Sequence, residues 1–329
     1  MQIQILSMTK LDLKLYRGYA NDDRLIVFGH AFTSWAPDKY KVTRRNIWHA
    51  FSVIQMFLIK PLKNQEVRLQ FKSIDVTTKT TDDGYFRFEV PYQFELESGW
   101  HEYEVTCKVN KYGIIGKGEL LKPHKSKFGI ISDIDDTFLV SHSDNIFKKI
   151  YIMLFRNVSK RKVFDDVTLH YQALSSFGQV KGESFNSFFY VSSSEWNLYD
   201  FIVEFTRIHS LPKAVIKLKK IKSGICDFIF SGKGNHDHKF EKIKDLLSFY
   251  PNLNYVLLGD DSQRDVYIYR KIIASNKPRI KAVYIRQTSS NKKPEVEMVI
   301  RDIESLNIPV CYCSTSITAI EHSKNIGLI

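Results

Sequence analysis

The spacing of apolar residues divides the chain into two parts that meet near residue 125. In the first part, short runs resemble strands with one buried face, at residues 24–29, 66–71, 85–90 and 103–109. The pair Asp83-Gly84 precedes the third of these runs and is typical of a tight hairpin turn. We therefore predict that residues 1–122 form a small β-sandwich domain.

One segment of this first part has a helical pattern. In NIWHAFSVIQMFLI, apolar residues recur at Ile47, Phe51, Ile54 and Leu58, and basic residues flank the segment on both sides. We predict an inserted amphipathic helix near residues 44–63. Two roles remain open for its apolar face: packing on the β domain, or lying at the surface of an anionic membrane.

The second part, residues 126–329, alternates continuous apolar runs with amphipathic stretches. The apolar runs are FGIIS, FFYVS, AVIKL, YVLLG, AVYIR and VCYC, and residues 145–155, 165–177 and 238–250 have helical spacing. This alternation predicts an α/β fold with a parallel sheet that helices cover on both faces. In such sheets the functional site lies at the carboxyl ends of the strands.

Acidic residues follow the first apolar run, in the sequence Asp133-Ile134-Asp135-Asp136-Thr137. A hard cation such as Mg²⁺ binds carboxylate oxygens and leaves positions for water and phosphate. One aspartate of the pair can attack phosphorus while its neighbour protonates the leaving oxygen. Helix capping by Asp-Asp-Thr is the alternative that requires no catalysis.

Two further features suit a phosphate ligand. Ser192, Ser193 and Ser194 follow the second apolar run, where hydroxyls and backbone N–H groups can hold a phosphate oxygen or simply cap a helix. A lysine at the start of the helix at 238–250, Lys239, can neutralise both the nucleophile and the phosphoryl group. Lys233 and Lys242 are its competitors for this role.

The fourth apolar run ends in Gly259-Asp260-Asp261, and Asp265 follows shortly after. Gly259 permits a close approach of the backbone, and Asp260 is placed to bind Mg²⁺. Asp265 is suited to brace Asp260, although capping of the next helix explains it equally well.

Together, DxDxT, strand-Ser, helix-Lys and GDxxxxD resemble the four-motif signature of haloacid-dehalogenase-superfamily phosphatases. More closely, residues 125–329 resemble the catalytic domain of the actin-patch phosphatidate phosphatase family, which includes bacterial members with a small β domain in front. The resemblance implies a Rossmann-like sheet. It also implies that Asp133 is the nucleophile, Asp135 the general acid/base, and both are ligands of Mg²⁺, Asp135 through its backbone carbonyl.

The same resemblance implies roles for the other motif residues. They are phosphate or substrate binding for Thr137, Ser192 and Ser193, catalysis for Lys239, metal binding for Asp260, and holding the metal ligands in place for Asp261 and Asp265. The family usually has GDSGQxDPEIY where this chain has GDDSQRDVYIY, so the choice of Asp260 over Asp261 stays open. Only 59 positions separate Asp133 from Ser192 and 47 separate Ser192 from Lys239, which leaves little room for a large cap.

Charge and composition narrow the possible partners. A formal charge of +12 favours polyanions: acidic lipids, phosphorylated substrates or nucleic acid, and it also suits solubility alone. The chain has no apolar run of 18 residues and no signal-like N-terminus, so we expect no transmembrane segment and a cytoplasmic location, peripheral at a membrane if the substrate is a lipid. Four scattered cysteines predict reduced core thiols, with Cys311 and Cys313 on one face of a strand.

The sequence therefore predicts a Mg²⁺-dependent phosphatase that acts through an aspartyl-phosphate, with phosphatidate or a related lipid phosphate as substrate. One alternative is a phosphatase for nucleic-acid ends or phosphoproteins. Another is a catalytically inactive lipid- or partner-binding module on the same fold.

Overall fold

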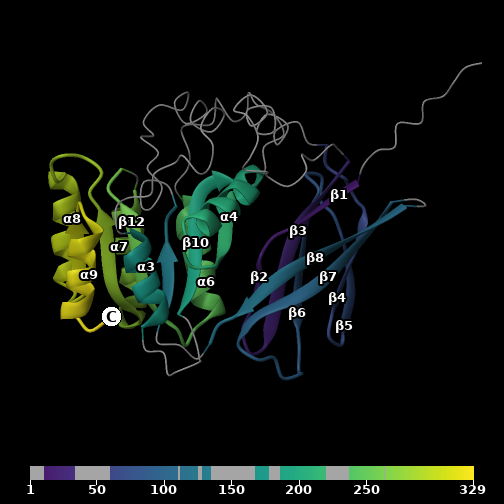
Figure 1. Cartoon of the computed structure of the whole chain (residues 1–329), viewed down its shortest axis with the longest axis horizontal. Coiled ribbons are helices and arrows are strands. Elements are labelled where there is room, and N and C mark those ends of the chain that lie inside the picture. The colour runs from purple at the N-terminus through teal and green to yellow at the C-terminus, as the bar shows by residue number, and fades with distance from the viewer. Residues whose placement is uncertain are drawn as a thin grey trace, which may run out of the picture.

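The structure, a computed structural model, describes residues 11–33, 60–109, 112–124, 128–134, 167–177, 186–219, 237–262 and 264–329. It contains two sheets side by side, an N-terminal one and a C-terminal one covered by helices (Figure 1). The helix predicted near residues 44–63 lies outside the described residues except for positions 60–63. The helix predicted at 145–155 lies entirely outside them.

The C-terminal sheet has six parallel strands in the order β11–β10–β9–β12–β13–β14. The strands are β9 (Phe128–Ser132), β10 (Ser187–Glu195), β11 (Ala214–Lys219), β12 (Asn254–Asp260), β13 (Ile280–Arg286) and β14 (Val310–Cys313). Each apolar run predicted as a strand forms one of them. The predicted α/β architecture with a parallel sheet is therefore confirmed.

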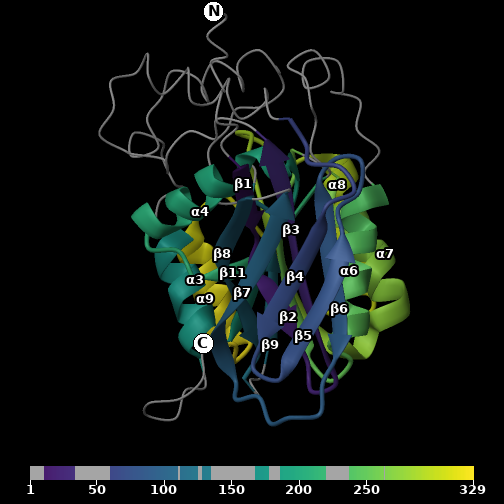
Figure 2. The same ribbon diagram turned by 90° about the vertical axis from the view of Figure 1, so that its right-hand side faces the viewer.

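Helices cover both faces of this sheet (Figure 2). One side carries α3 (Val167–Ser176), α4 (Tyr199–Ile208) and α9 (Ser316–Asn325); the other carries α6 (Asp237–Phe249), α7 (Asp265–Asn276) and α8 (Pro294–Glu304). The described residues of this part also form two short 3₁₀ helices, η2 (Trp196–Leu198) and η3 (Lys277–Arg279). In α6 the predicted apolar face is buried through Ile243 and Leu247, which lie four residues apart.

The N-terminal strands form one antiparallel sheet, apart from the parallel pair β2–β8. They are β1 (Leu11–Leu15), β2 (Gly18–Ala20), β3 (Arg24–Thr33), β4 (Glu66–Phe71), β5 (Ile74–Lys79), β6 (Tyr85–Pro91), β7 (Gly99–Val109) and β8 (Tyr112–Lys122). The four predicted runs correspond to β3, β4, β6 and β7. The strand order is β1–β3–β2–β8–β7–β4–β5, and β6 pairs with β3 outside this order. Because β6 also contacts β5, the sheet closes around its own apolar core.

The predicted turn at Asp83-Gly84 is present, but the prediction of a hairpin is wrong, because the strands on its two sides, β5 and β6, do not pair with each other. Gly84 has a φ of +77°, and a Cβ there would lie 2.5 Å from the carbonyl oxygen of Ala31. The strand after the turn, β6, pairs antiparallel with β3 along its length, from Arg24↔Pro91 to His30↔Tyr85. The turn therefore leads the chain away from β5 to a more distant partner.

Three of the four cysteines, Cys107, Cys311 and Cys313, lie in the described residues, and all three are buried free thiols. Cys311 and Cys313 flank the less buried Tyr312 on β14, so they occupy one face of the strand, as predicted. Within the same described residues, no helix is both long enough and apolar enough to cross a membrane.

The two sheets share a hydrophobic core. Tyr16, which is fully buried, stacks on Trp196 at a ring-centroid distance of 4.1 Å and belongs to the same cluster as the interior of the parallel sheet. The neighbouring Arg17 donates from its guanidinium to the carbonyl oxygen of Ala214 at 3.1 Å, and its backbone N–H donates to the hydroxyl of Tyr199 at 2.9 Å. We therefore expect the two parts to unfold as one unit.

Replacing Tyr16 by alanine tests this shared core. Tyr16→Ala should lower the free energy of unfolding by about 3–5 kcal/mol, because it leaves a cavity between the two sheets. Ile115→Ala, at an exposed position of β8, is the control and should change it by less than about 0.5 kcal/mol. Chemical denaturation followed by circular dichroism and by tryptophan fluorescence measures both. Two separate transitions, with only one of them shifted, would contradict a shared core.

Candidate active site

The candidate site lies at the carboxyl ends of the central strands. Asp133 directly follows β9, which lies between β10 and β12. Its backbone N–H donates to the carbonyl oxygen of Leu258 in β12 at 2.9 Å, and its side chain is fully buried. The sheet register thus brings Asp133 next to the end of β12, where the predicted Gly259-Asp260 pair lies.

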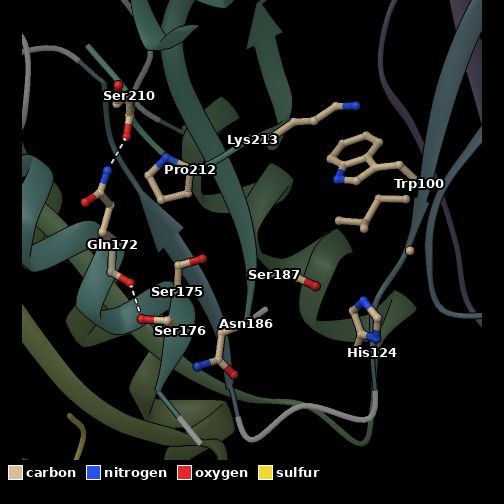
Figure 3. A pocket seen from close by; sticks show the side chains of 12 residues that line it. Trp100, His124, Gln172, Ser175, Ser176, Asn186, Ser187, Ser210, Pro212 and Lys213 are labelled. Atoms are coloured by element: carbon tan, nitrogen blue, oxygen red, sulfur yellow. Dashed lines mark hydrogen bonds between the residues drawn. The ribbon is translucent and has the colours of Figure 1, made fainter. Parts of the chain in front are cut away.

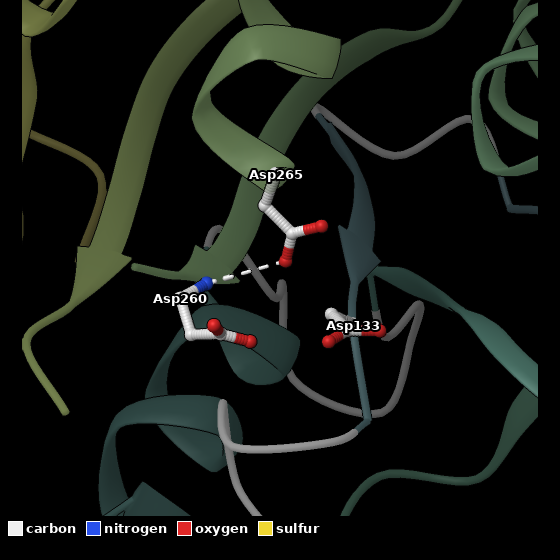
Figure 4. Close-up of side chains that lie close together, drawn as sticks. All are labelled: Asp133, Asp260 and Asp265. Carbon is white, nitrogen blue, oxygen red and sulfur yellow. Dashed lines mark hydrogen bonds between the residues drawn. The ribbon is translucent and has the colours of Figure 1, made fainter. Parts of the chain in front are cut away.

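Three buried carboxylates come together there (Figure 4). Asp133, Asp260 and Asp265 each offer one oxygen, and these oxygens all lie within 4.8 Å of one another. Asp265, the first residue of α7, accepts a hydrogen bond from the backbone N–H of Asp260 at 3.2 Å. A Cβ at Gly259 would lie 2.6 Å from the Oδ2 atom of Asp265, so glycine is needed for this close approach.

A lysine from helix α6 compensates part of this negative charge. Lys239, on the first turn of α6 and 2% exposed, places its Nζ 2.9 Å from Oδ1 of Asp133 and also forms an ion pair with Asp265. Burial by itself lowers the pKa of Lys239, but the carboxylates of Asp133 and Asp265 outweigh it and hold that pKa above its ordinary value. The side chain is therefore a cation at neutral pH.

One ammonium group does not balance three ionised carboxylates in a buried site. Carboxylate oxygens are the donors that a hard divalent cation prefers, and Mg²⁺ is bound in proteins by one or two carboxylates together with water and phosphate oxygens. The donor set of Asp133, Asp260 and Asp265 therefore suits a divalent cation. The chemistry of these residues alone does not distinguish Mg²⁺ from Ca²⁺ or Mn²⁺.

The two adjacent aspartates at the end of β12 have different surroundings. Asp260 is fully buried in the carboxylate cluster, and its Oδ1 accepts from the backbone N–H of Ser262 at 2.5 Å. The side chain of Asp261 instead accepts from the backbone N–H and the hydroxyl of Thr288, at 3.0 and 2.5 Å, and from the hydroxyl of Tyr312 at 2.6 Å. Asp261 thus joins the loop after β12 to β14 and to the loop after β13.

Ser192 and Ser193 lie near the end of β10. Ser192 is fully buried, whereas Ser193 is exposed. The carbonyl oxygen of Ser192 accepts a hydrogen bond of 2.8 Å from the Nζ of Lys242 on α6. This contact places a second lysine side chain, in addition to Lys239, beside the strand ends.

Lys242 is a site residue that the sequence argument considered only as a competitor of Lys239. Burial, followed by the nearby cations of Lys217, Lys239 and Lys219, lowers its pKa to about 7. Its spacing of three residues from Lys239 could have revealed it, since such positions share one face of a helix. Asp135 and Thr137, also predicted for the site, lie outside the described residues.

Two tyrosines that the sequence argument did not single out support the backbone at the site. The hydroxyl of Tyr171, on α3, lies 2.7 Å from Oγ of Ser132, which in turn donates to the carbonyl oxygen of Asp133 at 2.6 Å. From the other face of the sheet, the hydroxyl of Tyr269 on α7 donates to the carbonyl oxygen of Leu258 at 2.7 Å. A tyrosine within an otherwise apolar helix face could have indicated such a buried hydrogen bond from the sequence.

Comparison with known proteins gives one family match. Residues 128–287 match the family described as phosphatidate phosphatase APP1, catalytic domain. The phosphatidate phosphatase APP1 of Saccharomyces cerevisiae is 26% identical over 163 residues, which cover 50% of this chain and 26% of the yeast protein. The chain thus matches about a quarter of the length of this curated relative.

Similarity to solved structures is low. A carbohydrate acetylesterase from Xanthomonas citri, 10% identical, covers 92% of this chain and 68% of its own, with a TM-score of 0.31. The β-glucuronidase of Parabacteroides merdae, 8% identical, covers 92% of this chain and 38% of its own, with a TM-score of 0.26. Scores of this size carry no argument about fold or function.

The carboxylate cluster leads to a prediction about thermal stability. Mg²⁺ should raise the melting temperature of the wild type by several degrees, since binding contributes about 2.7 kcal/mol when the free ion is at about 100 times its Kd. Asp260→Asn should abolish this shift. It should also raise the melting temperature of the metal-free protein, because one of three mutually repelling carboxylates is removed.

Asp245→Asn, at an exposed position of α6, is the matched control and should retain the wild-type response to Mg²⁺. Differential scanning calorimetry with and without Mg²⁺ measures all three proteins. An Asp260→Asn protein that Mg²⁺ stabilises as much as the wild type would exclude the carboxylate cluster as the binding site.

Proposed function

Residues 128–287 belong to the phosphatidate phosphatase APP1 catalytic domain family, a family of phosphoric monoester hydrolases, and on this premise we propose that the chain is a Mg²⁺-dependent phosphatase. The observation that carries the proposal is the buried cluster of Asp133, Asp260 and Asp265 with Lys239 at the carboxyl ends of β9 and β12. The proposal includes a division into a β domain, residues 1–122, and a haloacid-dehalogenase-like domain without a large cap, residues 126–329.

In the proposed reaction Asp133 is the nucleophile. A carboxylate oxygen of Asp133 forms a bond to phosphorus while the bond to the alcohol oxygen of the substrate breaks, and Asp135 gives its proton to that oxygen. A water molecule then attacks the phosphorus of the aspartyl-phosphate, Asp135 takes up a proton from this water, and the carboxylate of Asp133 is released with inorganic phosphate. The two steps together consume one water molecule.

Asp133, Asp260 and the backbone carbonyl of Asp135 would hold the Mg²⁺ ion, which neutralises negative charge on the carboxylates and on the phosphoryl oxygens when bound. Asp265 would keep Asp260 in place, because its carboxylate accepts a hydrogen bond from the backbone N–H of Asp260. Lys239 lies against Asp133 and so stabilises the carboxylate form that attacks.

Binding of the phosphate group is assigned to the ends of β9 and β10. Thr137, Ser192 and Ser193 supply hydroxyl and backbone N–H groups there, as in the predicted motif. We add Lys242, whose Nζ already contacts the carbonyl oxygen of Ser192. A phosphate dianion beside this half-buried lysine would favour its charged form.

Phosphatidate or a related lipid phosphate is the proposed substrate. The name of the family and of the yeast relative supports it, as do the basic net charge of +12 and the amphipathic segment near residues 44–63. A peripheral protein that reaches its substrate at an anionic membrane surface would use both features. The retained set of Asp133, Lys239 and Asp260 disfavours an inactive binding module.

The nucleophile is tested by Asp133→Asn. Because an amide cannot act as the nucleophile but has the same shape, the variant should fold normally and release phosphate from p-nitrophenyl phosphate about 1,000-fold more slowly or worse. The control, Asp245→Asn, should keep wild-type activity. A folded Asp133→Asn protein that retains more than a few per cent of the activity would exclude Asp133 as the nucleophile.

The substrate is tested by release of phosphate from vesicles that contain phosphatidate, in comparison with nucleotides, DNA 3′-phosphates and phosphopeptides at equal phosphate concentration. We expect phosphatidate to be hydrolysed fastest, and excess EDTA to abolish the reaction, since it would remove the cation that the carboxylate cluster is proposed to bind. Faster release from a soluble substrate would overturn the lipid assignment alone. Turnover of none of them by the folded, Mg²⁺-loaded protein would favour the inactive module.

A further inference from the structure

A cavity separate from the carboxylate cluster lies where the two sheets meet (Figure 3). Its volume is about 530 Å³, which is in the range of pockets that hold small organic molecules. One wall belongs to the antiparallel sheet, through Trp100 and Leu121, and the other to α3, through Gln172 and Ser175. Both parts of the chain are therefore needed to form it.

The cavity and the candidate active site lie at opposite ends of the same strand. Ser187, the first residue of β10, lines the cavity, whereas Ser192 lies five residues later at the end of β10 near Lys242. A strand rises about 3.3 Å per residue, so about 16 Å separate the two positions. A molecule in the cavity would not occupy the phosphate site.

An indole ring dominates the apolar wall of the cavity. Trp100 on β7 is the cross-strand neighbour of Leu121 on β8, and the two side chains form one apolar surface. The Nζ of Lys213 lies 4.3 Å from the centre of the Trp100 ring and 2.6 Å from a carboxylate oxygen of Glu119. Glu119 already compensates the charge of Lys213. The positive charge at this side of the cavity therefore does not favour a multiply charged anion such as a phosphate.

The hydroxyl of Ser187 provides a polar point on the opposite side. Ser187 is 5% exposed, and its Oγ has no hydrogen-bond partner within the described ranges of the chain. Its neighbour Asn186 is fully engaged by contrast: its amide nitrogen donates to the carbonyl oxygen of Leu174 at 2.8 Å, and its amide oxygen accepts from the N–H of Phe128 at 3.3 Å. Buried hydroxyls are nearly always paired, so the Ser187 hydroxyl marks a place for a ligand oxygen.

We propose that this cavity binds a small planar aromatic molecule that carries a hydrogen-bonding oxygen. The ring lies against Trp100, because offset stacking on an indole adds to the burial of apolar area. The oxygen accepts a hydrogen bond from the hydroxyl of Ser187. This ligand differs in chemistry from a lipid phosphate, so the site is additional to the proposed phosphatase site.

The probe for this site is 2-naphthoate, a planar aromatic carboxylate, titrated into the full chain by isothermal titration calorimetry. We expect saturable binding with one molecule per chain. Ser187→Ala should weaken it about 5-fold, the effect of one lost hydrogen bond, and Trp100→Ala should weaken it about 10-fold or more. The control Leu169→Ala, at an exposed position of the same α3 helix, should bind as the wild type does.

Stability and activity separate a ligand role of Ser187 from a structural one. Because its hydroxyl has no partner in the described part of the chain, Ser187→Ala should keep or raise the melting temperature, and phosphate release should stay at the wild-type level. Ser187→Ala remains decisive even if Trp100→Ala does not fold. The proposal is overturned if 2-naphthoate shows no saturable binding, if Ser187→Ala binds it as tightly as the wild type, or if Ser187→Ala lowers the melting temperature.

Discussion

The ion pairs of Lys239 with Asp133 and Asp265 are the constraint on which the site depends. Without this cation, three carboxylates whose oxygens lie within 4.8 Å of one another would be buried without the ammonium group that compensates part of their charge, which is strongly unfavourable. Lysine compensates part of the charge while the cluster stays open to a divalent cation. The four residues come from β9, α6 and β12 with its following helix, so the ion pairs also fix these elements relative to one another.

Much of this arrangement could be predicted from the sequence, because the residues that follow parallel strands all lie at the same edge of the sheet. The inner strands of the C-terminal sheet, such as β9, β12 and β13, are buried on both faces and therefore read as continuous apolar runs. The polar residues that follow Ser132 and Leu258 must then meet wherever the two strands are neighbours, as β9 and β12 are. Motif order and strand ends were thus sufficient to group Asp133 with Asp260, although their distance and burial required the structure.

Other features were out of reach because they depend on contacts distant in sequence. The turn at Gly84 was evident, but the pairing of β6 with β3 joins residues about 60 positions apart, which no local pattern specifies. The different surroundings of Asp260 and Asp261 depend on Thr288 and Tyr312, which lie on later elements. The unpartnered hydroxyl of Ser187 could not be predicted either, since only the assembled fold shows whether a buried polar atom has a partner within the described residues.

The antiparallel sheet is more than a neighbour of the parallel sheet, because it contributes to the same core. Tyr16 packs on Trp196 at the end of β10, and Arg17 bonds to Tyr199 and Ala214 at the starts of α4 and β11. These contacts restrain β10 and β11 from outside the parallel sheet. The position of Ser192, and with it the proposed phosphate site, therefore depends on residues far from the carboxylate cluster. The same junction encloses the cavity beside Trp100, so one interface both positions a strand of the candidate active site and forms a second cavity.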